Sequence, residues 1–257
     1  MKDILSPRNR EVLEQFACSN VLLAFDYDGT LAPIVDDPAL ARMRLRTRNL
    51  LARVAGRYPC IVISGRASAD TRKRLEGSGV LAVVGNHGAE AGAAMNGFAA
   101  EVRRWRPILE ASLAPLQGVQ VEDKTYSIAI HYRRSRRKRL AREAAWRAAS
   151  SLGAVRIVGG KQVVNVVPRD AANKGDALER ARERFGCDTA VYVGDDDTDE
   201  DVFRLDQPGR LLSIRVGANG ASQAAYCLRD QRQIDLLLET LADLRRNSGP
   251  RRGELLD

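Results

Sequence analysis

The sequence predicts an α/β fold, with a Rossmann-like core built on a parallel sheet and an inserted α+β cap domain. Toward both ends of the chain, short apolar runs alternate with segments of helical periodicity, which is typical of a parallel sheet covered by helices. Between them, polar and apolar residues alternate as in half-exposed antiparallel strands. We assign residues 1–90 and 168–257 to the core and 91–167 to the cap; 257 residues with 44% hydrophobic content suffice for both.

The N-terminal part is predicted to supply three strands and two helices. Val21–Phe25 is wholly apolar, as expected for a strand that is buried on both faces. Residues 39–57 have the apolar spacing of a helix, and CIVIS at 60–64 is the second predicted strand. A polar helix at 68–75 and a third strand, VLAVVG at 80–85, follow.

The middle and C-terminal parts differ in pattern. We predict one strand over residues 119–133, a helix over 135–152, and a hairpin that turns at Gly159-Gly160. Strand and helix then alternate again, beginning with a helix at Lys174–Phe185 whose N-cap is Asn173. The remaining predicted elements are a strand at 189–194, a helix at 198–205, a strand at 211–217 and a helix at 234–244.

Polar residues follow three of the predicted parallel strands, and ligands of such sheets bind beyond the carboxyl ends of the strands. Asp26, Ser64 and Asp195 each occupy one of these ends. Asp26 and Asp28 are two residues apart and point to the same side, so their charges repel unless a cation or a proton lies between them. A capped turn, in which Asp28 accepts backbone N–H groups, is the alternative interpretation.

The stretch GDDDTDED at 194–201 carries six further carboxylates, which favour a hard cation with oxygen ligands such as Mg²⁺. The N-terminus of an acidic helix would also explain Asp199 and the acids after it, but it explains Asp195 and Asp196 less well.

Two further segments suit a phosphate group. Ser64 and the following Gly65 and Arg66 offer a hydroxyl and backbone N–H groups after a strand, although an ordinary turn has the same pattern. Lys174 opens a helix, where its charge opposes the helix dipole unless it faces an anion; a solvated lysine is the alternative. A carboxylate nucleophile, a second acid, a metal, a hydroxyl and a lysine are together what phosphoryl transfer requires.

The segments DYDGTLAPIV, VISGR, GNHGAE, VEDKTYSIAIHYR, NKGDAL and GDDDTDEDVF, in this order, resemble the haloacid dehalogenase superfamily of phosphatases, and within it the trehalose-6-phosphate phosphatases. The resemblance implies that Asp26 is the nucleophile that forms an aspartyl-phosphate, and that Asp28 is the general acid and base. It also implies Mg²⁺ held by Asp26, the Asp28 carbonyl and Asp195, with Asp196 or Asp199 behind them. Phosphoryl oxygens would be bound by Ser64, Gly65 and Lys174.

The same resemblance implies that the cap recognises the sugar. Glu122 and Lys124 match the family's Glu-x-Lys pair, and His87 and Arg133 match positions near the cap interface. A turn histidine bonded to the backbone is the alternative for His87. Asn165 stands where the family usually has Glu, and an amide binds sugar hydroxyls less strongly than a carboxylate.

Composition limits the partners. The net charge of +8 suits anionic partners, and the basic run at 133–139 raises nucleic-acid binding as an alternative. We favour a solvated face for this run, because no aromatic residues are interleaved with it. The four cysteines form no C-x-x-C pair, and no apolar run is long enough to span a membrane. We therefore expect a cytoplasmic monomer that binds neither nucleic acid nor membrane.

The function that follows is a Mg²⁺-dependent phosphatase acting on a sugar phosphate, with trehalose 6-phosphate favoured. A phosphatase for another glycosyl phosphate, such as glucosylglycerol, glucosylglycerate or sucrose phosphate, remains an alternative. A sugar phosphomutase would share the aspartyl-phosphate, and a catalytically silent sensor would share the binding groups but gain nothing from the carboxylates.

Overall fold

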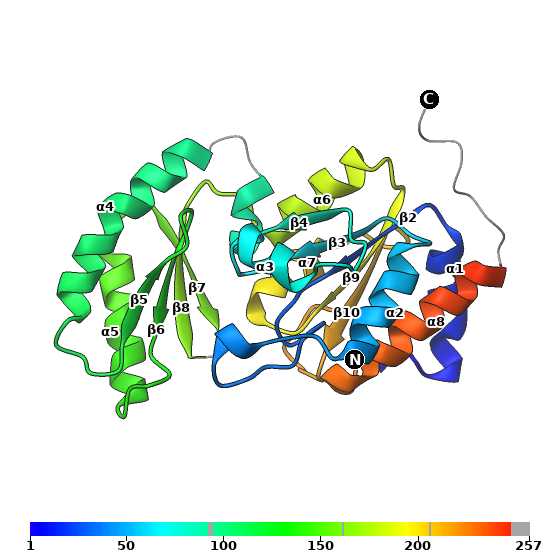
Figure 1. Ribbon diagram of the computed structural model, residues 1–257, viewed down its shortest axis with the longest axis horizontal. Coiled ribbons are helices and arrows are strands. Elements are labelled where there is room, and N and C mark those ends of the chain that lie inside the picture. Colours follow the sequence, from blue (N-terminus) through cyan, green and yellow to red (C-terminus); the bar gives the residue numbers. More distant parts are fainter. Residues whose placement is uncertain (92–94, 161, 206, 248–257) are drawn as a thin grey trace.

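The protein, described here by a computed structural model, contains two separate sheets (Figure 1). The structure describes residues 1–91, 95–160, 162–205 and 207–247. A seven-stranded sheet forms the core, and a four-stranded sheet lies in the inserted cap, which we define as the elements from α4 to β8. No helix in these ranges combines the length and the apolar character that a bilayer crossing requires.

The core sheet is parallel throughout and has the order β1-β11-β10-β9-β2-β3-β4. Its strands are β1 (Lys2–Asp3), β2 (Val21–Phe25), β3 (Cys60–Ile63), β4 (Ala82–Val84), β9 (Thr189–Gly194), β10 (Leu211–Val216) and β11 (Tyr226–Leu228). Without the short β1, this is the strand order of a Rossmann fold. The order reverses between β2 and β9, and such a switch point is where doubly wound sheets bind their ligands.

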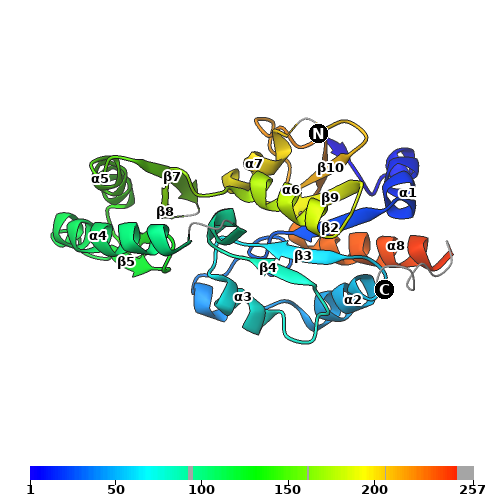
Figure 2. The same cartoon turned by 90° about the horizontal axis from the view of Figure 1, so that it is seen from above.

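Helices cover both faces of this sheet (Figure 2). One apolar core lies between the sheet and α1 (Arg10–Cys18), α2 (Leu45–Ala55) and α8 (Ile234–Asn247). A second lies beneath α6 (Lys174–Arg184) and α7 (Glu200–Phe203), while α3 (Ser68–Arg74) packs near β4. The short 3-10 helices are η1 (Pro7–Asn9), η2 (Pro38–Leu40), η3 (Asn86–Ala91), η4 (Asp197–Asp199) and η5 (Gln231–Gln233).

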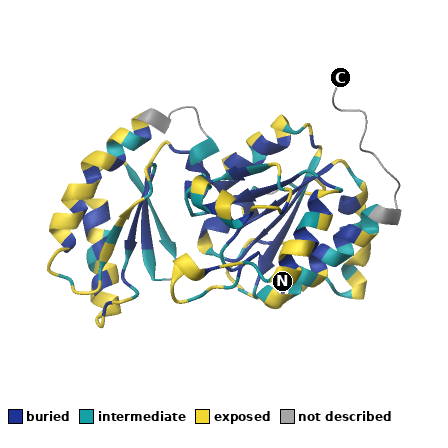
Figure 3. Ribbon diagram, viewed as in Figure 1, coloured by how far each residue is buried: buried dark blue, intermediate teal, exposed yellow. Residues whose placement is uncertain are grey.

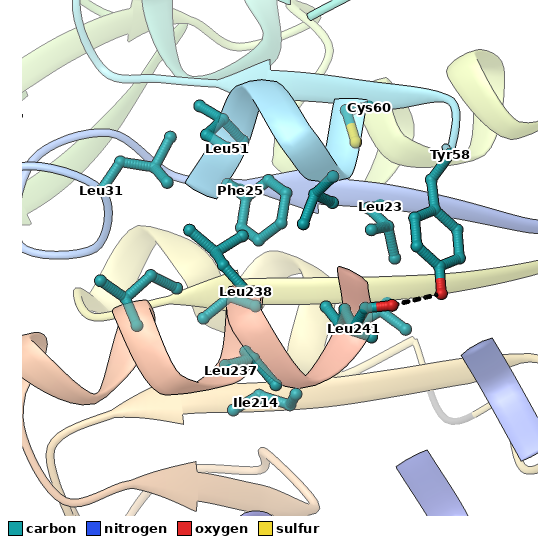
Figure 4. Close-up of a cluster of buried hydrophobic side chains, with 14 of the residues drawn as sticks. Leu23, Phe25, Leu31, Leu51, Tyr58, Cys60, Ile214, Leu237, Leu238 and Leu241 are labelled. Atoms are coloured by element: carbon teal, nitrogen blue, oxygen red, sulfur yellow. Dashed lines mark hydrogen bonds between the residues drawn. The ribbon is translucent and has the colours of Figure 1, made fainter. Parts of the chain in front are cut away.

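The central strands of the core sheet, β2, β3, β9 and β10, are almost completely buried (Figure 3). Leu23 and Phe25 of β2 pack against Leu237 and Leu238 of α8 (Figure 4). At the edge of this cluster the Tyr58 hydroxyl donates to the Leu241 carbonyl at 2.9 Å, so its polar group is satisfied where it is buried.

The cap packs two helices against one face of an antiparallel sheet. Its order is β5-β6-β8-β7. The elements are α4 (Met95–Leu113), β5 (Gln120–Asp123), β6 (Ile128–His131), α5 (Lys138–Ser150), β7 (Val155–Gly160) and β8 (Val163–Pro168). The structure therefore confirms the predicted class, a parallel α/β core that carries an α+β insertion.

Two predictions within the cap are wrong in detail. The single strand expected over 119–133 is a hairpin of β5 and β6, because the Asp123 side chain accepts the N–H of Thr125, which has a φ of 72°. The turn expected at Gly159-Gly160 lies further on: both glycines belong to β7, Gly160 pairs with Val163, and Gln162 has a φ of 64°.

The structure also differs from the sequence prediction at two helices. The helix expected over 39–57 is only α2, since the preceding residues form η2 and then an extended stretch whose Ala41 carbonyl accepts a hydrogen bond from Arg74. The long helix α4 was not predicted at all, and it contains Pro107, which lowers the helical signal of its sequence.

Candidate functional site

Three buried carboxylates meet at the switch point of the core sheet. Asp26 follows β2, Asp195 follows β9, and Asp199 ends η4. One carboxylate oxygen of each lies within 4.8 Å of those of the other two, and the three residues are 4%, 7% and 0% exposed. The parallel pairing of β2 with β9 brings the two strand ends together, which explains how residues 169 positions apart form one site.

Lys174 supplies the positive charge of this cluster. Its Nζ donates to Asp26 Oδ1 at 3.0 Å and to Asp199 Oδ1 at 2.7 Å, and the residue is 1% exposed. The lysine is the first residue of α6, whose start is fixed by a capping box between Asn173 and Asp176. Its position therefore depends on a helix terminus that the sequence specifies locally.

Asp199 is also held from two other directions. The Tyr192 hydroxyl donates to Asp199 Oδ1 at 2.7 Å, and the Asp196 N–H donates to Asp199 Oδ2 at 2.8 Å. The Asp196 side chain instead accepts the N–H of Asp197 at 2.8 Å and caps η4. Of the two aspartates expected behind the metal, the structure thus places Asp199 in the cluster and Asp196 at the adjoining helix start.

The cluster has an excess of negative charge. Burial raises the pKa of Asp26 well above its ordinary value, and Asp199 and Asp195 raise it further, while Lys174 opposes them. Burial alone would lower the pKa of Lys174, but Asp199 and Asp26 outweigh it and hold that pKa well above its ordinary value. Three carboxylates and one ammonium leave about two negative charges when all are ionised, which a divalent cation would balance.

Two glycines lie so close to the carboxylates of the cluster that neither position could carry a side chain. Gly29 has a φ of 85°, and a Cβ there would overlap the Asp195 carboxylate. A Cβ at Gly194 would likewise overlap the carboxylate of Asp199. The donor set consists of carboxylate oxygens, which hard cations prefer. Asp26, Asp195 and Asp199 therefore fit a divalent metal.

Asp28 lies beside this cluster but is not part of it. Its two carboxylate oxygens accept hydrogen bonds from Arg66, at 2.5 Å from Nε and at 2.8 Å from Nη2. Its side chain is 36% exposed, in contrast to the buried Asp26. The structure therefore separates the two carboxylates of the DYDG motif into different surroundings.

The end of β3 brings Ser64, Gly65 and His87 together. Ser64 is fully buried, and its Oγ accepts the N–H of Arg66 at 3.2 Å. A Cβ at Gly65 would overlap the His87 ring, so only glycine allows this contact. Burial lowers the pKa of His87 well below its ordinary value, and nearby Lys124 and Lys174 lower it further, so the ring is neutral at physiological pH.

The cap side chains reach the core to different extents. Lys124 Nζ donates to the Gly65 carbonyl at 3.1 Å, whereas Glu122 pairs with His131 at 2.7 Å on the cap itself. Arg133 Nη1 donates to two carbonyls of the core loop 33–41, those of Val35 and Asp36, each at 2.8 Å. Asn165 of β8 is 3% exposed.

Three residues of the site were not identified from the sequence in the roles they take. Arg66 was considered only for its backbone, Tyr192 only as part of an apolar strand, and His131 not at all. A tyrosine two residues before a strand end is a detectable signal, because i and i+2 share a face. The pairing of Arg66 with Asp28 has no local signal, since 38 residues separate them.

Comparisons with known proteins agree on one family. The family model described as trehalose-phosphatase matches residues 24–230. The chain is 35% identical over 253 residues to a trehalose-phosphate phosphatase of Mycolicibacterium paratuberculosis, covering 88% of this chain and 63% of that relative. Trehalose-phosphate phosphatase B of Arabidopsis thaliana is 26% identical over 270 residues, covering 93% and 70% of the two chains.

Solved structures share the fold. The C-terminal domain of C. albicans trehalose-6-phosphate phosphatase superposes with a TM-score of 0.78 at 25% identity, covering 92% of this chain and 98% of that one. The sucrose-phosphatase of Synechocystis sp. gives a TM-score of 0.57 at 15% identity, covering 88% and 98%. The chain spans 63% of the length of the trehalose-phosphate phosphatases of Mycolicibacterium paratuberculosis and Mycobacterium avium.

Proposed function

The chain belongs to the trehalose-phosphatase family, and from this premise we propose that it is a phosphatase that hydrolyses a sugar phosphate, with trehalose 6-phosphate as the favoured substrate. One observation carries the proposal. A buried carboxylate, that of Asp26, is held by a lysine at 3.0 Å at the switch point of the sheet, beside two more buried carboxylates. Phosphate monoesters hydrolyse very slowly without help, so a nucleophile protected from charge repulsion is what the reaction requires.

Asp26 is proposed as the nucleophile. Its oxygen attacks phosphorus, the bond to the leaving sugar oxygen breaks, and an aspartyl-phosphate forms on Asp26. Lys174 holds the Asp26 carboxylate and attracts the phosphoryl oxygens, which reduces the repulsion between two anions. Ser64 and Gly65, at the end of β3, are proposed to bind the remaining phosphoryl oxygens.

Asp28 is proposed as the general acid and base. In the first step it would protonate the leaving sugar oxygen. In the second step it would take a proton from the water that attacks the phosphorus of the aspartyl-phosphate, so that the bond between phosphorus and the Asp26 oxygen breaks and inorganic phosphate leaves. Its partial exposure supports this role, because a proton donor must reach both the sugar and water.

The metal is proposed to be Mg²⁺. The family implies a divalent metal, and the carboxylates of Asp26, Asp195 and Asp199, with the Asp28 carbonyl, would hold it. When bound, it supplies positive charge that neutralises the phosphate dianion. Asp196 would act from behind this set by fixing the start of η4.

The cap is proposed to recognise the sugar through Glu122, Lys124, Arg133 and His87. Lys124 contacts the Gly65 carbonyl of the core, which supports a place for it beside the proposed phosphate-binding residues Ser64 and Gly65. Asn165 is buried on β8, where its side chain acts on the pKa of His87, and its amide is expected to bind sugar hydroxyls more weakly than the family's usual Glu. Asn165→Glu is therefore expected to raise kcat/KM for trehalose 6-phosphate.

The test is a phosphate-release assay with and without Mg²⁺. It compares trehalose 6-phosphate, sucrose 6-phosphate, glucosylglycerol phosphate, glucosylglycerate phosphate and glucose 6-phosphate. Asp26→Asn is expected to abolish turnover and the acid-stable phosphoenzyme. Full activity of this variant would contradict the proposed chemistry, while a better substrate than trehalose 6-phosphate would contradict only the favoured sugar.

A sugar phosphomutase would transfer the phosphoryl group back to a sugar. It is distinguished by its need for a bisphosphate activator and by the absence of phosphate release. We further propose a cytoplasmic enzyme that acts as a monomer, which size-exclusion chromatography with light scattering would test.

A further inference from the structure

The Arg66 side chain donates to three residues beside the site, and the chemistry above gives it no role. Its guanidinium donates to both oxygens of Asp28, to Asp70 Oδ2 at 3.0 Å and to the Pro38 carbonyl at 2.7 Å. It also lies 5.8 Å from the centre of the Tyr27 ring, within the range of a cation–π contact. The side chain is only 12% exposed. Such a group is fixed in one orientation.

The charge of Arg66 is balanced in place. Burial opposes a charged guanidinium, but Asp28 and Asp70 outweigh it and raise the pKa of Arg66 above its ordinary value. A planar guanidinium that meets both oxygens of a carboxylate fixes the plane of that carboxylate as well as its distance. The Asp28 side chain is 36% exposed, and its pair with Arg66 holds both of its carboxylate oxygens.

A neighbouring arginine shows that local structure alone does not require this arrangement. Arg74 also donates to Asp70 at 3.0 Å, and it holds the loop 33–41 through the Ala39 and Ala41 carbonyls. Arg66 and Arg74 therefore both tie α3 to this loop. Only Arg66 adds the two contacts with Asp28.

We propose that Arg66 is a positioning residue that fixes the orientation of the Asp28 carboxylate for proton exchange with the sugar oxygen and water. The inference rests on the proposed function, in which Asp28 exchanges those protons. In the observed arrangement each Asp28 oxygen accepts one hydrogen bond from Arg66. A carboxylate oxygen has two lone pairs, so each oxygen keeps one for proton exchange while Arg66 holds the plane of the carboxylate. The Pro38 carbonyl on the same guanidinium joins this pair to the loop that the cap residue Arg133 holds at Val35 and Asp36.

The experiment is a double-mutant cycle with two substrates. Arg66→Gln, Asp28→Ala and the double variant are compared in Mg²⁺ for steady-state turnover of trehalose 6-phosphate and for the first-turnover burst with p-nitrophenyl phosphate. The aryl leaving group needs little protonation, so its burst reports the attack by the nucleophile alone. Arg74→Gln is the matched control, because it shares Asp70 and the loop but not Asp28.

We expect Arg66→Gln to lower kcat for trehalose 6-phosphate by about 100-fold, with KM and the p-nitrophenol burst within about threefold of the unchanged protein. The double variant should be no slower than Asp28→Ala. Arg66→Lys keeps the charge but not the two-pronged guanidinium, so its kcat should lie between those of the unchanged protein and Arg66→Gln. It replaces Arg66→Gln in the test if that variant does not fold. Arg74→Gln should stay within about threefold.

Two results would overturn the inference: a loss from Arg66→Gln that persists undiminished in the Asp28→Ala background, or an equal loss in the p-nitrophenol burst. An unchanged kcat in Arg66→Gln would do the same. Failure of the proposed function is a separate outcome, because then the unchanged protein itself releases no phosphate from trehalose 6-phosphate.

Discussion

Replacing Lys174 with methionine should lower the free energy of unfolding, and either Mg²⁺ or a lower pH should reduce this loss. The ammonium lies 2.7 Å from Asp199 and 3.0 Å from Asp26, and all three side chains are almost completely buried. At an effective dielectric constant of about 20, Coulomb's law gives about 6 kcal/mol for each contact. The desolvation of the ammonium offsets much of this attraction, and removal of one partner from a buried ion pair typically lowers the free energy of unfolding by about 3–5 kcal/mol.

The assay is urea unfolding followed by far-ultraviolet circular dichroism near neutral pH, with a chelator or with saturating Mg²⁺. Lys174→Met should lose about 3–5 kcal/mol in the chelator and regain part of it in Mg²⁺, because the divalent cation balances the same carboxylates. Arg182→Met is the control on the same helix. Arg182 is 5% exposed, but its partner Glu179 reaches water, so the loss should be smaller and independent of Mg²⁺.

The pH dependence gives a second check on the sign. The pKa of Asp26 is raised in the folded protein, so its protonation favours folding, and its ionisation weakens folding as pH rises through that pKa. Without Lys174 this pKa should rise further. The difference in stability between the two proteins should therefore shrink as pH falls from about 8 to about 5. A loss below about 1 kcal/mol, or an equal Mg²⁺ response in both variants, would refute the reasoning.

Three further predictions concern the neighbouring groups. Tyr192→Phe removes the hydroxyl that donates to Asp199 and should lower the free energy of unfolding, measured by urea titration, by about 1–3 kcal/mol. An unchanged free energy of unfolding would contradict this prediction. His131 lowers the pKa of Glu122, so in His131→Gln the Glu122 carboxylate should be protonated at a higher pH. As pH falls, the KM for the sugar phosphate should therefore begin to rise at a higher pH in this variant than in the unchanged protein, and identical plots of KM against pH would contradict this. Removing the metal should abolish turnover, and the rise in Tm on adding Mg²⁺ should be greater at about pH 8 than at about pH 5, because protons compete with the metal for Asp26; calorimetry at both pH values tests this.

The sequence predicts those helices and strands that are marked by a pattern within a few neighbouring residues. The apolar β2, the alternation of strand and helix around it, and the Asn173 cap of α6 follow from periodicity and from the chemistry of helix ends. The helix α4 is not predicted because Pro107 weakens the helical signal of its sequence. The hairpin of β5 and β6 is predicted as a single strand because polar and apolar residues alternate in the same way on both sides of its tight turn.

The candidate site divides in the same way. The sequence by itself determined that carboxylates stand at the ends of β2 and β9 and that a lysine opens α6, because the ends of elements are marked within a few residues. Only the tertiary structure decided that Asp199 rather than Asp196 joins Asp26, that Arg66 takes both oxygens of Asp28, and that the cap's Lys124 reaches Gly65. Those contacts join residues far apart in the chain, and they depend on how the sheet, the helices and the cap pack together, which no short stretch of sequence specifies.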